Sequence, residues 1–156
     1  MAYSYDETND YQSIADDARL TLPDGDWSVG CWLKLDDNVG TAYQYFMSWG
    51  GFDATNSFQF YVGEATATLT NDRNEIQIKS KDSGGTSAGI VRTSGAPGTS
   101  TAWQHVIGVR ASDVLDIYID GSSQASVSLT SYNIVNRADA FEIGRRTDAN
   151  ADRYFG

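Results

Sequence analysis

The stretch Leu115-Asp116-Ile117-Tyr118-Ile119-Asp120-Gly121 decides the fold class of this 156-residue chain. Apolar residues stand at 115, 117 and 119, and this period of two places them on one face of a β-strand. Asp120-Gly121 then marks a tight turn, because an Asp-Gly pair accepts the left-handed backbone of a two-residue hairpin. A second alternating run follows at 124–129, so the stretch predicts a β-hairpin.

The period of two recurs along the chain at a spacing of roughly ten residues. Phe58, Phe60 and Val62 share one face of a predicted strand, and Ile76 and Ile78 share one face of the next. Helical periodicity is nearly absent. Short strands at regular spacing are typical of an all-β sandwich or barrel, and the length suits a single domain over 1–156. The predicted strands are 11–14, 28–35, 43–49, 57–63, 75–80, 88–92, 103–110, 115–120, 124–129 and 140–145.

Charge and composition exclude several classes of function. The chain has 21 acidic and 11 basic residues, and its net charge of −10 repels phosphate backbones and anionic lipid. We therefore expect no nucleic-acid partner. No apolar stretch approaches the roughly 20 residues of a membrane span, and the first residues do not form a secretory signal. We expect synthesis in a cytoplasm and no membrane insertion.

Three stretches taken together resemble the laminin-G-like, or concanavalin A-like, jelly-roll domains. The resemblance implies an antiparallel two-sheet jelly-roll sandwich with a lectin-like fold. The hairpin motif "Trp-x-His-Val … Leu-x-x-Tyr-x-Asp-Gly" is its most specific part. The stretches are 10–14 with Asp26-Trp27-Ser28-Val29-Gly30-Cys31-Trp32-Leu33-Lys34; Trp103-Gln104-His105-Val106 with 115–121; and Phe141-Glu142-Ile143-Gly144 with Arg153-Tyr154-Phe155-Gly156.

The sequence departs from this family at its end. In the family the aromatic-Gly ending leads into one further strand, which pairs beside the first strand. Here the sequence stops at Gly156, so the final edge strand is expected to be missing. Either the sequence is trimmed, or the edge beside the first strand is open and is filled by another chain.

The sequence gives little support for a catalytic function. His105 is the only histidine and Cys31 the only cysteine, which excludes an internal disulfide and argues against a zinc site or a catalytic triad. Glucanases of this fold use two Glu that flank an Asp in one strand. No Glu of this chain has an acidic neighbour two residues away, and we therefore expect a protein that is not an enzyme.

Calcium is the better chemical candidate for a bound ion. Asp148, Asn150 and Asp152 stand at alternate positions, where hard oxygen ligands can converge on one Ca²⁺ in a loop. The alternative is a solvated acidic turn that Arg145 and Arg146 balance. Both interpretations stay open at this point.

Sugar binding needs an aromatic face for the apolar side of a sugar ring and polar groups for its hydroxyls. One stretch carries both, and alternation places its Tyr43, Tyr45 and Met47 on one face. The alternative is that these aromatic side chains pack in the core and on a sheet face. The candidate carbohydrate-binding residues are Tyr43, Tyr45, Trp49, Phe52, Asp53 and Asn56, whereas the residues expected in the core are Trp27, Trp32 and Trp103.

Two functions from different classes follow. In the first, which we favour, the chain is a structural or surface component of a virion, such as a capsid decoration or tail protein of a bacteriophage. It would assemble on other virion proteins or on itself by edge-strand pairing, and would also contact host glycans. The absence of an export signal and the incomplete sandwich edge favour it. In the alternative, the chain is a free-standing extracellular lectin or adhesin module with its site on loops and one calcium ion.

Overall fold

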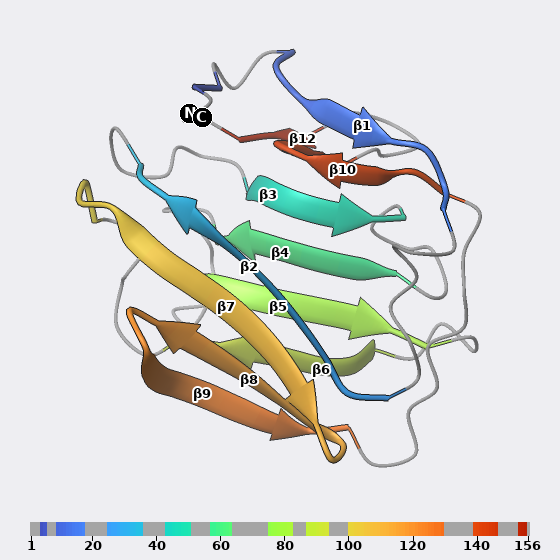
Figure 1. Ribbon diagram of the computed structural model, residues 1–156, viewed down its shortest axis with the longest axis vertical. Coiled ribbons are helices and arrows are strands. Elements are labelled where there is room, and N and C mark those ends of the chain that lie inside the picture. Colours follow the sequence, from blue (N-terminus) through green and yellow to red (C-terminus); the bar gives the residue numbers. More distant parts are fainter. Residues whose placement is uncertain are drawn as a thin grey trace.

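Two antiparallel sheets face each other in the computed structural model (Figure 1). The structure describes residues 4–5, 9–17, 25–35, 43–50, 57–63, 75–82, 87–93, 100–129, 139–146 and 153–155. These residues contain no helix that is long and apolar enough to cross a membrane. The all-β, two-sheet fold that the sequence predicts is confirmed.

Both sheets join strands that are far apart in the sequence. The order of the larger sheet is β1 (Gln12–Ile14), β10 (Phe141–Ile143), β3 (Gln44–Trp49), β4 (Phe58–Val62), β5 (Ile76–Lys81) and β6 (Ser87–Arg92). The order of the smaller sheet is β2 (Trp27–Leu33), β7 (Gln104–Ala111), β8 (Val114–Ile119) and β9 (Ser122–Ser128). The remaining pair, which packs beside β3, is β11 (Arg145–Arg146) and β12 (Arg153–Tyr154).

The predicted strands agree closely with these bounds. Each is present with its ends shifted by at most two residues, except that the predicted strand at 140–145 is divided at Gly144 into β10 and β11. Gly144 has a φ of 82°, a backbone conformation that cannot continue a regular strand. The sequence pattern does not predict β12.

The core lies between the sheets and follows the predicted alternation. Phe58, Phe60 and Val62 of β4 are fully buried, and Leu115 and Ile117 of β8 meet them from the other sheet. Alternation in the sequence therefore predicts which residues face the core, because each strand has one face on the core and the other turned away from it.

Close approach of the two sheets depends on Gly108 in β7. A Cβ atom at this position would overlap the side chain of Ile78 in β5. Glycine therefore lets β7 lie directly on the larger sheet.

A β-bulge in β3 corrects one expectation about faces. The register with β4 shifts between Tyr45 and Met47, so that Phe46 and Met47 both belong to the core. Tyr45 instead contacts Tyr61. The neighbours of Tyr61 in β4, Phe60 and Val62, point into the core, so Tyr61 and Tyr45 lie on the opposite face of the sheet. The prediction that Tyr45 and Met47 share a face is therefore wrong, because the extra residue of a bulge reverses the alternation beyond it.

The two edges of the sandwich differ. At one edge, β6 packs against β8 and β9 and closes the space between the sheets. At the other, among the described residues, β1 ends the larger sheet and β2 ends the smaller one, and few contacts join these two strands. Figure 1 shows β1, β10 and β12 lying beyond the front sheet at this edge. We call it the open edge.

Candidate functional site

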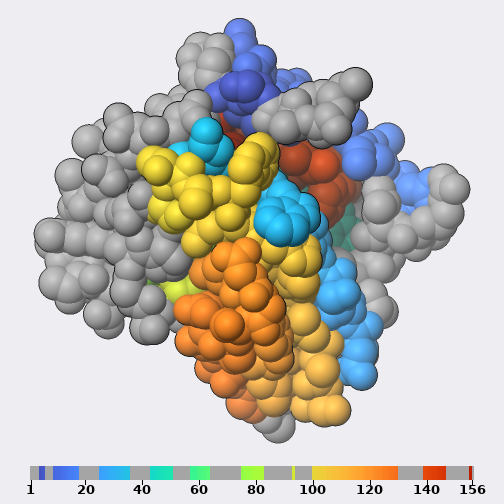
Figure 2. Space-filling view, turned by 60° about the vertical axis from the view of Figure 1, so that its left-hand side comes forward, coloured from blue at the N-terminus to red at the C-terminus, as the bar shows by residue number. Residues whose placement is uncertain are grey.

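A pocket of about 360 Å³ lies at the open edge, where the end of β2 stands over β3 and β10. Its buried wall comes from the two sheets and the C-terminal segment, and it is apolar: Leu33, Phe46, Met47 and Phe155. Figure 2 shows the region from outside, with red C-terminal strands visible between the light blue of β2 and the blue of the N-terminal residues. The pocket is lined by residues of both sheets, and the described side chains do not fill it.

Two exposed tryptophans line the same pocket. Trp32 is 63% exposed and Trp103 is 51% exposed, whereas a large apolar side chain is normally well buried. Both were expected in the core, and that expectation is wrong. Trp32 alternates with Cys31 and Leu33, which face inward, and Trp103 precedes the first residue of β7. Strand alternation could have predicted the exposure of Trp32, because its neighbour Leu33 faces the core.

His105 holds Trp32 in place across the strand pair. The two residues are register partners, and their rings stack with centroids 4.9 Å apart and planes inclined by 20°. One face of the indole is therefore covered by imidazole. Since Trp32 remains largely exposed, the other face is open to solvent.

Asp120 fixes the strand that carries His105. Its Oδ1 atom accepts a hydrogen bond from the His105 backbone N–H at 2.9 Å, and its own N–H donates to the His105 carbonyl at 2.9 Å. Asp120 and Gly121 have φ values of 50° and 79°, as the predicted tight turn requires. The Trp-x-His and Asp-Gly parts of the motif thus form one structural unit beside the pocket.

The two ends of the described chain form another wall. The Tyr5 ring lies on the backbone of Gly144 and meets the Phe155 ring edge to face, with centroids 6.1 Å apart. The Phe155 backbone N–H donates to the Gly144 carbonyl at 2.9 Å. Residues far apart in sequence therefore complete one cavity.

The charge of the pocket contrasts with that of the whole chain. Lys34 is charged, whereas no Asp or Glu occurs among the described lining residues, although the chain carries 21 acidic residues. Cys31 also lines the pocket, and burial raises the pKa of its thiol from 9.0 to about 12. The thiol is therefore neutral at physiological pH, and the pocket suits a ligand that is neutral or weakly anionic.

The sugar-binding residues predicted from the sequence are divided by the structure. Tyr43 is half-buried and Tyr45 is fully buried, and both rings contact the Tyr61 ring, at 5.7 and 4.9 Å between centroids. Trp49 belongs to the core, where its indole N–H donates to the Asp139 carbonyl at 2.9 Å. Phe52, Asp53 and Asn56 lie outside the described residues.

The tyrosine pair contacts a buried cation. The Arg146 guanidinium lies over the Tyr45 ring, 4.3 Å from its centroid, and donates a hydrogen bond to the Tyr45 hydroxyl. The Tyr61 hydroxyl donates to Gln77 Oε1 at 3.0 Å. Tyr45, Tyr61 and Arg146 are buried, and Tyr43 is the half-buried member of this cluster.

The predicted calcium ligands Asp148, Asn150 and Asp152 also lie outside the described residues. Within the part of the chain that is described, no three His, Cys, Asp or Glu side chains come together to hold a metal ion. The calcium site stays a prediction.

Comparison with known proteins places the fold. No curated protein matches the sequence. The binding domain of Paraclostridial Mosquitocidal Protein 1 is similar in structure, with a TM-score of 0.69 at 11% identity over 94% of this chain and 36% of that one. This chain thus spans about a third of that structure's length.

A second similar structure is the CBM40 of the Ruminococcus gnavus IT-sialidase, bound to α2,3-sialyllactose. Its TM-score is 0.63 at 11% identity, over 97% of this chain and 83% of that one. The sequence model of the "Concanavalin A-like lectin/glucanases superfamily", in its Laminin_G_3 branch, matches residues 6–156. The chain belongs to this superfamily.

Proposed function

We propose that this chain is a non-catalytic carbohydrate-binding module whose site is the pocket rim formed by Trp32 and Trp103. The observation that carries the proposal is that both indoles are more than half exposed and border one apolar pocket. A sugar ring has an apolar C–H side that packs on an aromatic face, while its hydroxyls stay in water at the rim. The CBM40 that shares the fold is bound to a sialylated sugar, which supports this class of ligand.

The stacked pair of Trp32 and His105 suits this role. An indole that is held on one side by imidazole presents its other face in a fixed orientation. A fixed side chain loses less conformational entropy on binding than a mobile one. Trp32 is therefore the main stacking surface in this proposal, and Trp103 the second.

The test is a glycan array followed by calorimetric titration of the best ligand. We expect Trp32→Ala to weaken binding by about tenfold or more, equivalent to about 1.4 kcal/mol. Tyr118→Ala is the matched control, because Tyr118 is a half-buried aromatic residue of the same sheet that does not line the pocket. Absence of binding to any glycan, or equal losses in both variants, would contradict the proposal.

Two further arms separate the sites predicted from the sequence. Tyr43→Ala removes the partly accessible tyrosine of the larger sheet, and a loss confined to this variant would move the site to that face. Titration with Ca²⁺ and again with chelator tests the predicted ion. If chelation abolished binding, Asp148, Asn150 and Asp152 would be the next residues to substitute.

Assembly on a virion is a second proposal, supported by the open edge. β1 ends the larger sheet, and Tyr11 and Ile14 beside and within it are 42% and 41% exposed. An edge strand with apolar side chains favours strand addition by another chain. In this role the protein stands on a particle surface, paired with itself or with another virion protein.

Light scattering over a concentration series tests the self-pairing form of this second proposal. The wild-type chain should form oligomers that Ile14→Lys disrupts, because a charge on the edge opposes strand pairing. A wild-type chain that stays monomeric at every concentration would count against self-pairing.

A further inference from the structure

The interior of the pocket and its rim suit different parts of a ligand. The rim carries exposed indoles, whereas the inner wall consists of side chains that are at most 8% exposed, among them Phe46, Met47 and Phe155. A hydroxyl group placed against this wall would lose its hydrogen bonds to water without gaining others, which is unfavourable. A polyhydroxylated ring therefore fits the rim and not the interior.

Size restricts what enters the interior. About 360 Å³ is at the lower end of the range of roughly 300 to 1,000 Å³ that is typical of ligand pockets. A space of this size suits a short substituent and the sugar ring that carries it. The open edge leaves the rest of a longer glycan outside, in solvent.

Charge restricts the ligand further. The Cys31 thiol on the wall is neutral, and the described lining residues include Lys34 but no carboxylate that would pair with an amino sugar. The net charge of −10 opposes the approach of a polyanionic glycan. A neutral ligand meets neither obstacle.

We propose that the pocket selects neutral or weakly anionic saccharides that carry a methyl-bearing substituent on the ring, with the methyl end of the substituent inside the pocket and the ring on Trp32. The methyl end of an acetamido group, whose amide stays at the rim, and a short alkyl aglycone are two sources of this chemistry. The proposal rests on the proposed function, because it assigns the ligand class of the same site. It makes the apolar wall, and not the rim alone, the origin of specificity.

Matched sugars test the proposal on the wild-type chain by calorimetric titration. One arm compares N-acetylglucosamine with glucose, and the other compares hexyl glucoside with methyl glucoside. Burial of each methyl or methylene group should strengthen binding by about fourfold. We expect the substituted sugar to bind at least fourfold more tightly in one or both arms, and the arm that responds identifies the source.

A variant that fills the pocket tests whether the preference for the substituted sugar arises there. Cys31→Met adds volume at a wall position and should reduce the preference for the substituted sugar to less than twofold. Cys31→Ala is the matched control and should keep the preference. Circular dichroism shows whether each variant is folded, and the wild-type sugar series decides the matter if Cys31→Met does not fold.

The outcomes separate the two proposals. If plain and substituted sugars bind equally, the selection is wrong and the carbohydrate-binding function stands. A preference that persists in folded Cys31→Met also overturns the selection, because the substituent then lies elsewhere. If no sugar in either arm binds and the glycan array is also negative, the proposed function itself fails.

Discussion

The two ends of β2 carry tryptophans in opposite environments. Trp27 is 9% exposed and meets the Phe58 ring edge to face, with centroids 5.5 Å apart. Trp32 is 63% exposed and lies flat on His105. An odd number of positions separates them, so the strand turns them to opposite faces. The same residue type therefore stabilises the fold at one end of β2 and stays available for a ligand at the other.

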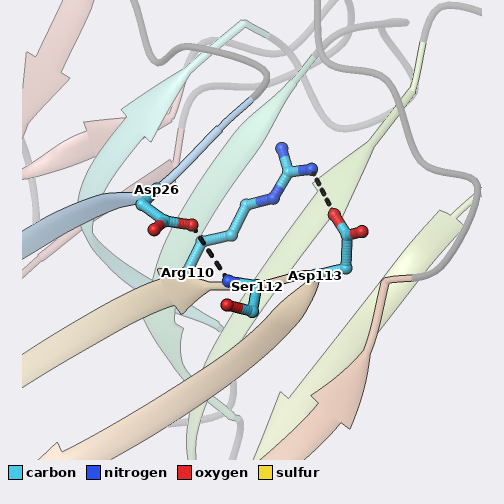
Figure 3. A network of polar contacts seen from close by, with 4 residues as sticks. All are labelled: Asp26, Arg110, Ser112 and Asp113. Atoms are coloured by element: carbon cyan, nitrogen blue, oxygen red, sulfur yellow. Dashed lines mark hydrogen bonds and ion pairs between the residues drawn. The ribbon is translucent and has the colours of Figure 1, made fainter.

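The surroundings of the two ends also differ. Beside Trp27, Asp26 Oδ1 accepts a hydrogen bond from the Ser112 backbone N–H at 2.9 Å, and Arg110 pairs with Asp113 at 3.1 Å (Figure 3). These contacts hold the β7–β8 turn, where Ser112 and Asp113 have φ values of 48° and 61°. Beside Trp32 lies the pocket. One end of β2 is thus fixed by packing and hydrogen bonds, and the other borders a cavity.

The largest effect should come from Trp27→Ala. Removal of this side chain from the core should lower the free energy of unfolding by about 3–5 kcal/mol, since a buried aromatic ring is replaced by a cavity. Urea denaturation followed by circular dichroism measures the loss. Trp27→Phe keeps a ring against Phe58 and should cost less. If Trp27→Ala were neutral, the anchoring role of this end of β2 would be refuted.

Asp26→Ala should have an intermediate effect. The variant leaves the Ser112 N–H without its carboxylate acceptor, and the expected loss of stability is about 0.5–1.5 kcal/mol. Asp26→Asn keeps an acceptor oxygen and should recover most of the loss in the same denaturation experiment. Equal losses in the two variants would indicate that the hydrogen bond to the turn is not the cause.

Trp32→Ala should have the smallest effect on stability. An exposed side chain contributes little to folding, and we expect a change within about 0.5 kcal/mol. The same variant should lose ligand affinity, which distinguishes a binding residue from an anchoring one. A loss of stability comparable to that of Trp27→Ala would remove the contrast between the two ends.

The sequence was sufficient for the strands and for most of the core. Alternation is a local property, and Leu115, Ile117 and Ile119 repeat it without interruption, so their burial follows directly. The Asp120-Gly121 turn follows from local chemistry in the same way. These features need no knowledge of which strands are neighbours.

The candidate site was much less predictable. The bulge at Tyr45–Met47 has no Gly or Pro to mark it, and it reverses the faces of a strand that reads as regular. The pocket brings together β2, β3, β10 and both ends of the described chain, and no local sequence pattern predicts that these segments meet. The exposure of Trp32 could have been predicted, because strand alternation from the buried Leu33 turns Trp32 outward. The usual burial of tryptophan suggested the core instead.

Nuclear magnetic resonance of the indole N–H groups tests the central claim most directly. The chain has four tryptophans, and each gives one indole signal that can be assigned by single substitution. On titration with N-acetylglucosamine or the best glycan of the array, the signals of Trp32 and Trp103 should shift, whereas those of buried Trp27 and Trp49 should stay in place. Binding that shifts neither Trp32 nor Trp103 would contradict the account, because the ligand would then lie away from the pocket.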